Sequence, residues 1–311
     1  MTQDTPFSLP SRGPLILGAG GRIGRAFRHL WQQGQWPDKA VPLWHSSQKL
    51  DHAETVIAPL DPAGLARLAV TAIGVRTHGI IVLAGATSGT PEELAANTAT
   101  AQTAVILRAL GVAGPILCLS SSAVYGPHAE PVREDSPLAP ASAYGAAKLA
   151  MEQAMAAHQG VTCLRLANVA GCDGLLGAMT GGDVALDRIG DGTTADSRGV
   201  TGQGPLRSYI GPLTLARTLT ALTRMENLPP VLNLAQSGAL PMEALLQAAK
   251  ARWHWQDAPE GVLAKLALDT TALQALVTLP PADAATLVAE AEAAGWYNPQ
   301  YGTPRKGHPT R

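Results

Sequence analysis

Short apolar runs alternate with helical segments over the first 170 residues, and this alternation restricts the fold more than any other feature of the sequence. The runs are continuously apolar, which is typical of strands buried on both faces of a sheet. They lie at residues 14–17, 40–44, 55–58, 79–83, 115–119 and 161–166. Helices are predicted between them at 22–33, 91–110 and 142–158, with another starting at Asp61-Pro62. We therefore expect a doubly wound parallel sheet of the Rossmann type, in the α/β class.

The pattern changes after Gly171, where the chain becomes rich in glycine, aspartate and threonine. Later segments predict a strand at 231–234 and helices at 212–225, 240–252 and 281–294, with Trp253-His254-Trp255 ending the second helix. We expect a dinucleotide-binding domain and a smaller C-terminal α/β lid that binds substrate. The predicted parts are a loose leader at 1–13, the Rossmann domain at 14–170 plus roughly 207–235, the lid at 171–206 and 236–295, and a tail at 296–311.

Composition excludes several classes of protein. The 23 basic and 24 acidic residues give a net charge of −1, without the basic excess of a nucleic-acid-binding protein. No apolar stretch reaches about 18 residues, the length that a membrane span needs, and the first residues do not resemble a secretory signal. Three cysteines, an odd number, favour a reducing cytoplasm over a disulfide scaffold. Eight scattered histidines show no paired spacing, so we expect no metal site.

A glycine cluster, Gly18-Ala19-Gly20-Gly21-Arg22-Ile23-Gly24, follows the first predicted strand and precedes a helix. Such a turn presents backbone N–H groups and a helix N-terminus to a pyrophosphate. Gly18, Gly21 and Gly24 fit a GxxGxxG spacing, whereas the alternative GxGxxG spacing would need glycine where Ile23 stands. The turn predicts a dinucleotide site, and a tight turn without a ligand is the other interpretation. The predicted cofactor contacts here are Gly18, Gly20, Gly21, Arg22, Ile23 and Gly24.

The end of the second strand carries no carboxylate to bind an adenosine ribose, which an NAD enzyme would be expected to have. Instead the sequence reads His45-Ser46-Ser47-Gln48-Lys49. Hydroxyls, an imidazole and an ammonium tolerate a 2′-phosphate, and Arg22 offers a second positive charge. We therefore favour NADP over NAD, with His45, Ser46, Ser47 and Lys49 as predicted contacts. An ordinary solvated loop is the alternative.

Serine, tyrosine and lysine residues form the candidate catalytic set. Ser120, Ser121 and Ser122 end the strand at 115–119, and Tyr144 and Lys148 share one face of a later helix at i and i+4. A phenol with a pKa near 10 can serve as a base if a neighbouring ammonium and a cofactor cation favour its ionised form. A serine hydroxyl opposite can orient a substrate alcohol or carbonyl. An exposed helix with incidental tyrosine and lysine is the alternative.

Several ordered blocks of the sequence resemble the NAD-dependent epimerase/dehydratase family of the extended short-chain dehydrogenase/reductase superfamily. These blocks are GAGGRIG at 18–24, LAGAT at 83–87 with Asn97, SSSAVYG at 120–126, REDSPLAP at 133–140, YGAAK at 144–148, LRLANVAG at 164–171, GQGPLRSYI at 202–210, LNLA at 232–235 and LDT at 268–270. The resemblance runs from about residue 14 to residue 280. It implies an NAD(P)-dependent enzyme that acts on a hydroxyl or keto carbon of a sugar, most often linked to a nucleotide.

The resemblance also implies roles for individual residues. Tyr144 corresponds to the catalytic acid/base and Lys148 to its partner and ribose ligand, with Ser121 as the catalytic serine and Ser122 as the alternative. The remaining implied cofactor contacts are Leu60, Asp61, Leu83, Ala84, Gly85, Asn97, Ser120 and Ala167. The implied substrate contacts are Thr87, Ser121, Ser122, Tyr144, Asn168 and Arg207, with Asn168 and Arg207 toward a phosphate. The family also pairs the helices at 91–110 and 142–158 across a dimer, so we expect a homodimer with Val105, Leu149, Met151 and Met155 at its interface.

Departures from the family pattern leave the reaction open. Ser122-Ala123 stands where the 4,6-dehydratases have Asp-Glu, which argues against dehydration. The acids of the family's RDxIHVDD block are missing after Arg207, which weakens the assignment of a standard nucleotide sugar. An epimerase and a net oxidoreductase both remain. The other candidates are an NADPH-dependent ketone or aldehyde reductase of a non-nucleotide small molecule, and a dinucleotide-sensing protein without catalysis.

Overall fold

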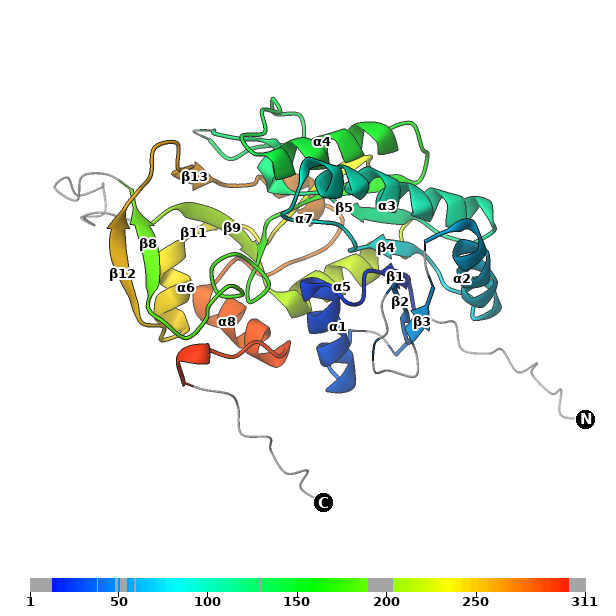
Figure 1. Ribbon diagram of the computed structural model, residues 1–311, viewed down its shortest axis with the longest axis horizontal. Helices are drawn as coiled ribbons and strands as arrows, with labels where there is room; N and C mark the ends of the chain where they lie inside the picture. Colours follow the sequence, from blue (N-terminus) through cyan, green and yellow to red (C-terminus); the bar gives the residue numbers. More distant parts are fainter. Residues whose placement is uncertain are drawn as a thin grey trace, which may run out of the picture.

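The computed structural model describes residues 13–37, 39–47, 50, 55–58, 60–128, 130–189 and 204–301. Its centre is a sheet of seven parallel strands in the order β10-β6-β5-β4-β1-β2-β3. The strands are β1 (Leu15–Leu17), β2 (Leu43–Ser46), β3 (Thr55–Ile57), β4 (Ile80–Val82), β5 (Ile116–Leu119), β6 (Val161–Leu166) and β10 (Val231–Leu234). The predicted doubly wound α/β fold is confirmed, because the order reverses between β1 and β4 (Figure 1).

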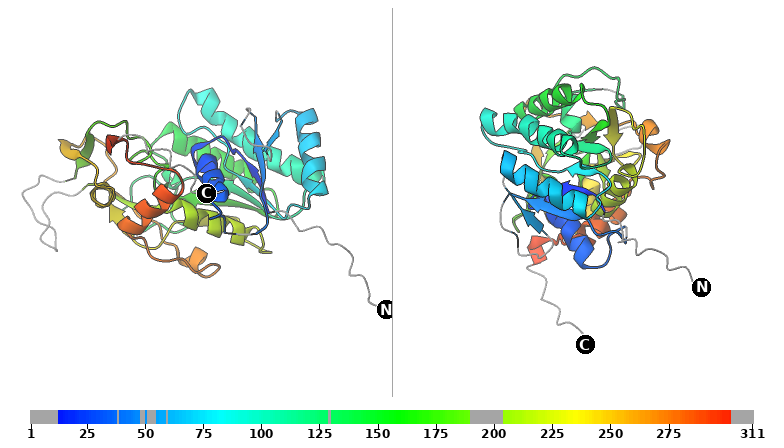
Figure 2. Two further views of the ribbon diagram at one scale, coloured as in Figure 1. Left: turned by 90° about the horizontal axis from the view of Figure 1, so that it is seen from below. Right: turned by 90° about the vertical axis from the view of Figure 1, so that its right-hand side faces the viewer.

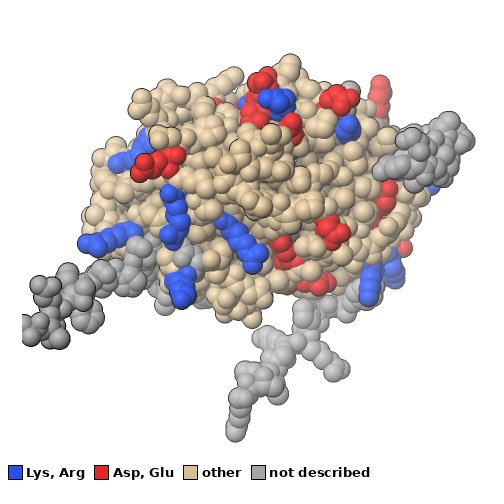
Figure 3. Space-filling model, turned by 180° about the vertical axis from the view of Figure 1, so that it is seen from behind, with Lys and Arg blue, Asp and Glu red and all other residues tan. Residues whose placement is uncertain are grey.

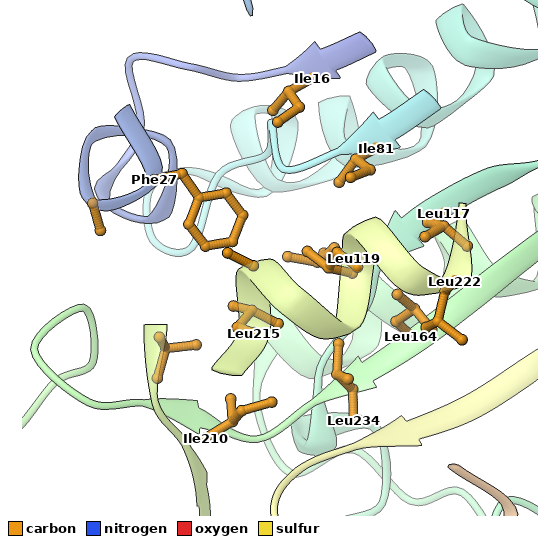
Figure 4. Packing of buried hydrophobic residues seen from close by; sticks show 14 of the residues in the cluster. Ile16, Phe27, Ile81, Leu117, Leu119, Leu164, Ile210, Leu215, Leu222 and Leu234 are labelled. Atoms are coloured by element: carbon orange, nitrogen blue, oxygen red, sulfur yellow. The ribbon is translucent and has the colours of Figure 1, made fainter. Parts of the chain in front are cut away.

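Helices cover both faces of this sheet (Figures 1 and 2). One face is covered by α2 (Pro62–Gly74), α3 (Pro91–Ala109) and α4 (Ala143–Met155). The other is covered by α1 (Arg22–Gln32) and α5 (Pro212–Leu222). Strand side chains alternate between the two cores: Leu15 and Leu17 pack with α2 and α3, whereas Ile16 packs with Phe27 of α1. Figure 4 shows the second core, in which Leu215 and Leu222 of α5 lie against the strands.

Local sequence signals explain where these helices begin. Thr90 and Glu93 form a reciprocal capping box at the start of α3, and Pro91 occupies the first helical position. The Asp61 carboxylate caps α2 through the N–H of Gly64, and the Ser142 hydroxyl caps α4 through the N–H of Gly145. These starts agree with the sequence predictions.

The second predicted strand lies further along the chain than expected. The run at 40–44 predicts a strand there, but β2 spans Leu43–Ser46. Pro42 has no N–H to donate to a neighbouring strand, and within the strand the Leu43 N–H donates to the carbonyl of Pro14. The register places His45 opposite Leu17 of β1.

The C-terminal part forms two smaller sheets at the carboxyl end of the large one. β7 (Asn168–Val169), β9 (Leu206–Ile210), β11 (Ala239–Pro241) and β13 (Lys265–Leu266) form a four-stranded sheet, and β8 (Val184–Arg188) pairs with β12 (Trp253–Asp257). Three short helices accompany them: α6 (Met242–Ala248), α7 (Thr271–Gln274) and α8 (Ala284–Ala293). The 3-10 turns are η1 (Ser122–Val124) and η2 (Pro299–Tyr301).

The sequence interpretation of Trp253-His254-Trp255 as a helix end is wrong. These residues lie in β12, with Trp253 opposite Val184 of β8. Helix α6 ends at Ala248, and Lys250 after it takes a positive φ of 52°, which breaks the helical path. The strand is specified by a partner nearly 70 residues away, which a local pattern does not reveal.

The surface carries few charges. Acidic and basic side chains are scattered over the face in Figure 3, most of which is uncharged, as the charged fraction of 15% implies. None of the described helices is long and apolar enough to cross a membrane. Within the described ranges, no group of three or more histidine, cysteine or acidic side chains is arranged to hold a metal ion.

Candidate active site

The glycine turn between β1 and α1 leaves backbone donors free for a ligand. Gly21 is the N-cap of α1 and supplies no side-chain cap, and the first turn of the helix contains no acidic residue. Gly18 has a φ of +98°, and a Cβ atom there would lie 2.5 Å from the Ala84 nitrogen. A Cβ on Gly24 would lie 2.3 Å from the Gly18 carbonyl oxygen. The turn therefore requires these two glycines, and its uncapped N–H groups fit the phosphates of a dinucleotide.

The loop after β4 lies beside this turn and carries a second feature that fits a ligand. Asn97 of α3 is buried, its Nδ2 donates to the Ala86 carbonyl at 3.0 Å, and its Oδ1 has no hydrogen-bond partner. A Cβ on Gly85, which has a φ of +156°, would lie 2.3 Å from that oxygen and 3.3 Å from the Lys148 nitrogen. The Asn97 Oδ1 is a buried acceptor without a hydrogen-bond partner, and it lies beside the backbone of a glycine that has no side chain. This arrangement fits the hydroxyl of a bound ribose. Leu83 and Ala84 continue the same wall, each donating its N–H to Leu17.

Ser121 and Tyr144 are brought together where η1 packs on α4. The Ser121 hydroxyl caps η1 by accepting from the Ala123 N–H at 3.2 Å. Gly145 permits the close approach, since a Cβ there would lie 2.4 Å from the Ala123 carbonyl oxygen. Burial raises the pKa of the Tyr144 phenol, while its hydrogen bond with Ser121 and the charge of Arg22 act to lower it.

Lys148 lies one turn below Tyr144, with its nitrogen 6.0 Å from the centre of the phenol ring. The ammonium is buried and donates to the Leu119 carbonyl, the last of β5, at 2.8 Å. Burial lowers the pKa of Lys148 to about 8. The structure thus brings Ser121, Tyr144 and Lys148 to one place, beside Gly85 and Asn97.

Arg22 lies on the Tyr144 side of the turn rather than at the end of β2. Its Nη2 donates to the Thr87 hydroxyl at 3.3 Å and its Nη1 to the backbone carbonyl of Asp173 at 3.2 Å. Its positive charge is close enough to act on the Tyr144 phenol. The predicted role of Arg22 as a 2′-phosphate contact is therefore not supported.

The end of β2 differs from the prediction in part. The His45 side chain is only 2% exposed, its Nε2 binds the Ala58 carbonyl at 2.9 Å, and burial lowers its pKa, so a ribose contact is not supported. Ser46 lies next to the turn, because a Cβ on Gly20 would be 3.4 Å from its hydroxyl oxygen. Ser47 is exposed, and Lys49 lies outside the described residues.

The side chains of three other predicted cofactor contacts make interactions within the protein. The Asp61 carboxylate caps α2, and Leu60 packs against the core on the α2 side of the sheet. The Ser120 hydroxyl donates to Glu152 at 2.5 Å inside the protein. The predicted cofactor contacts of these three residues stay a prediction, which the backbone rather than these side chains would have to provide.

The predicted substrate contacts lie on the small sheet and its neighbours. Asn168 of β7 is opposite Tyr209 of β9, and Arg207 lies two residues before Tyr209. The Arg207 guanidinium donates to the carbonyls of Leu206 and Leu263, so it is already bonded to the backbone. Thr87 is held by Arg22, Ser122 lies in η1 beside Ser121, and Ala167 is buried and donates its N–H to Leu234.

A buried polar network supports the site and was missed from the sequence. Glu152 of α4 binds both Ser120 and Arg165 of β6. The same guanidinium donates to the Tyr125 hydroxyl at 2.9 Å, which in turn donates to Asn233 at 2.7 Å. The available signals were an acid four residues after Lys148 and a single charged residue, Arg165, inside a predicted buried strand. The network ties α4 to β5 and β6 beneath the three candidate catalytic residues.

Solved structures with the same fold are distant in sequence. UDP-glucose 4-epimerase from Brucella ovis in complex with NAD matches with a TM-score of 0.72 at 18% identity, over 94% of this chain and 99% of that one. The Thermotoga maritima UDP-glucose 4-epimerase with UDP-glucose gives 0.68 at 19%, over 90% and 98%. The dTDP-glucose 4,6-dehydratase DesIV from Streptomyces venezuelae, with NAD and TYD bound, gives 0.67 at 19%, over 93% and 99%. Among curated protein sequences, none matches this chain.

The fold and the glycine turn together define a nucleotide-binding α/β protein of the short-chain dehydrogenase/reductase type. The model of the NAD dependent epimerase/dehydratase family matches residues 14–179, more than half of the chain. The chain therefore belongs to this family of NAD-dependent enzymes, as the sequence blocks predicted.

Proposed function

We propose that the protein is an NAD(P)-dependent epimerase or oxidoreductase that acts on a hydroxyl or keto carbon of a nucleotide-linked sugar. The observation that carries this proposal is that Ser121, Tyr144 and a buried Lys148 come together next to an uncapped glycine turn, with the Lys148 nitrogen 6.0 Å from the centre of the Tyr144 ring. The structural neighbours support the substrate class, because their names contain UDP- or dTDP-sugars, in two of the three together with NAD. Family membership supports the cofactor class.

The residues at the turn and beside it fit a nicotinamide dinucleotide. The N–H groups at the start of α1 would bind its pyrophosphate, and Lys148 and the free Oδ1 of Asn97 would bind its ribose hydroxyls. When bound, the nicotinamide accepts or donates a hydride at the substrate carbon. Tyr144 moves the accompanying proton, because its hydroxyl is the titratable group that Ser121 touches.

The protein must lower the pKa of Tyr144 before this residue can act as a base. In the structure, burial raises that pKa, and Ser121 and Arg22 oppose the shift. The Lys148 ammonium is 6.0 Å from the ring centre and favours the phenolate electrostatically. Ser121 orients the substrate oxygen toward the phenol, and the rigid η1–α4 contact keeps the two hydroxyls together.

The choice between NAD and NADP rests on fewer residues than the sequence indicated. Arg22 is bonded to Thr87 and Asp173, and His45 is buried. Ser46 lies beside Gly20 and Ser47 after it is exposed, and NADP preference stays our prediction. The Brucella ovis epimerase and the Streptomyces venezuelae dehydratase structures contain NAD, so both cofactors must be compared directly on this protein.

The test is turnover of nucleotide sugars by the purified protein. UDP-glucose, UDP-glucuronic acid and dTDP-glucose would each be incubated with NAD or NADP, and the products separated by chromatography and identified by mass spectrometry. An epimer formed without net cofactor reduction supports an epimerase, and stoichiometric NAD(P)H supports an oxidoreductase. Failure to convert any of the sugars, together with conversion of a simple ketone by NADPH, would support the non-nucleotide reductase instead.

A further inference from the structure

A cavity lies beside α1, between this helix and the C-terminal part of the chain, and includes Arg22 next to the glycine turn. Its volume is about 480 Å³, within the range of small-molecule pockets. Three segments form its walls: the exposed face of α1, the loop 170–179 after β7, and residues 291–299 at the end of α8 and beyond. In Figure 1, α1 and α8 lie on the same side of the large sheet, and residues of both line the cavity.

Basic side chains from one face of α1 line this cavity. Arg22, Arg25 and His29 are spaced at i, i+3 and i+7, so they follow one another along the helix. Both arginines are exposed. No aspartate or glutamate is among the described residues that line the cavity.

The hydrogen bonds of these arginines leave their charge unneutralised. Arg22 donates to Thr87 and to a backbone carbonyl, and Arg25 donates through Nη1 to the Gly20 carbonyl at 3.1 Å. All these acceptors are uncharged, and neither arginine forms an ion pair within the described part of the chain. The neighbouring Asp173 carboxyl is buried and accepts from the Gly177 N–H. The described side chains that line the cavity therefore carry positive charge and no carboxylate, and the nearest acid named here is the buried Asp173, whose Oδ2 has no hydrogen-bond partner.

We propose that this cavity binds the phosphate or diphosphate group of a small organic molecule. Guanidinium groups bind phosphate oxygens in a bidentate manner. Arg22 to His29 span about 10 Å along the helix at 1.5 Å per residue, which is more than a single carboxylate can bridge. Trp296 and Tyr297 provide an aromatic wall for the organic part, and the Trp296 indole is fixed by its N–H bond to Leu176 at 3.0 Å. The inference goes beyond the proposed function and stands whether or not nucleotide sugars are substrates.

The first experiment measures binding of inorganic pyrophosphate to the protein saturated with its dinucleotide, by isothermal titration calorimetry at constant ionic strength. Saturation with the dinucleotide removes binding at the glycine turn itself. We expect one site per chain. Arg25→Ala should weaken binding at least tenfold, since one charge-assisted hydrogen bond contributes about 1.5–3 kcal/mol. His29→Ala should weaken it as well, and His29 is two turns from the start of α1 and distant from the glycine turn.

Arg217→Ala is the matched control, because Arg217 is an exposed arginine on α5 that does not line the cavity. This variant should bind pyrophosphate like the unmodified protein. The proposal is overturned if the dinucleotide-saturated protein binds no pyrophosphate, or if Arg25→Ala and His29→Ala bind it as tightly as Arg217→Ala does. Circular dichroism of each variant verifies that it is folded before binding is compared.

A competition experiment identifies the source of the phosphate. If the substrate supplies it, pyrophosphate will compete with UDP-glucose for the dinucleotide-saturated protein, and Arg25→Ala will weaken both. If a separate metabolite supplies it, pyrophosphate and UDP-glucose will bind together with independent affinities. Both results support a phosphate site. The absence of UDP-glucose binding would count against the proposed function, but it would leave the pyrophosphate measurement intact.

Discussion

The Arg165 guanidinium binds the Glu152 carboxylate through two nitrogens, with Nη2 2.8 Å from Oε2 and Nε 3.2 Å from Oε1. Both side chains are buried, at 4% and 6% exposure. The pair joins α4, which carries Tyr144 and Lys148, to β6. The position of α4, the helix of the candidate active site, therefore depends on a buried ion pair.

Glu152→Gln should lower the free energy of unfolding by about 3–5 kcal/mol, because it leaves a buried guanidinium without its counter-ion. Urea denaturation measures the change. Asp135→Asn is the control, since it removes the exposed ion pair with Arg133, which should contribute no more than about 1 kcal/mol. Equal losses in the two variants would contradict the role that we give to the buried pair.

Tyr144→Phe should reduce turnover about 10²–10⁴-fold, the usual range for loss of a general acid/base. The phenyl ring retains the packing on α4, so the affinity for the dinucleotide should stay nearly unchanged. Steady-state kinetics and cofactor titration measure the two quantities. Near-normal turnover in this variant would remove Tyr144 from the reaction.

Lys148 should make stability depend on pH in a defined window. Its pKa is lowered from 10.5 to about 8 by burial, so below pH 8 the folded protein carries the whole cost of the buried charge. Between pH 8 and 10.5 the folded state releases the proton while the unfolded state retains it, and stability therefore rises with pH. The variant Lys148→Met has no ammonium at this position, so this rise of stability with pH should be absent from it.

The difference in unfolding free energy between the unmodified protein and Lys148→Met should shift by about 2–3 kcal/mol in favour of the unmodified protein from pH 7 to pH 10. Urea denaturation without cofactor, at both pH values, measures this shift. A difference that stays constant would mean that Lys148 titrates as an ordinary exposed lysine.

Ser47→Asp should reverse the predicted preference for NADP. Ser47 is exposed directly after β2, and Ser46 before it lies beside Gly20 of the turn. A carboxylate at position 47 repels a 2′-phosphate and accepts hydrogen bonds from ribose hydroxyls. We expect NADP affinity to fall and NAD affinity to rise, each roughly tenfold for one charge-assisted bond. Titration of both cofactors into the unmodified protein must first give tighter binding of NADP, and tighter NAD binding would refute the preference.

We predict a homodimer formed through the adjacent helices α3 and α4, although the structure changes the residues concerned. Met151 and Met155, expected at the interface, are buried against the sheet, whereas Val105 and Leu149 are partly exposed. Light scattering at micromolar concentration should give twice the chain mass of 32.1 kDa. Val105→Lys on α3 should shift the mass toward the monomer, and the control Val70→Lys on α2 should not. A monomeric mass for the unmodified protein would contradict the prediction.

Signals contained in a few consecutive residues predicted the fold well. The Thr90-Pro91 start, the glycine turn and the buried runs each act locally, and their elements lie within a few residues of their predicted places. Contacts made across the chain could not be predicted in this way. β12 depends on Val184, and the carbonyl that binds Arg207 belongs to Leu263. The direction of the Arg22 side chain depends on Thr87 and Asp173. The sequence therefore located the residues of the candidate site better than it located what their side chains bind.

A single residue, Ala167, separates β6 of the large sheet from β7 of the small one. Because this connection is so short, the backbone of β6 determines where the small sheet lies. The same strand carries Arg165 and runs beneath Tyr144. Any insertion at this point would displace the groups on β7 and β9 relative to the proton-transfer residues. The strands β8 and β12 pair in a separate two-stranded sheet, so a change of length there would leave this connection and the reacting centre unaltered.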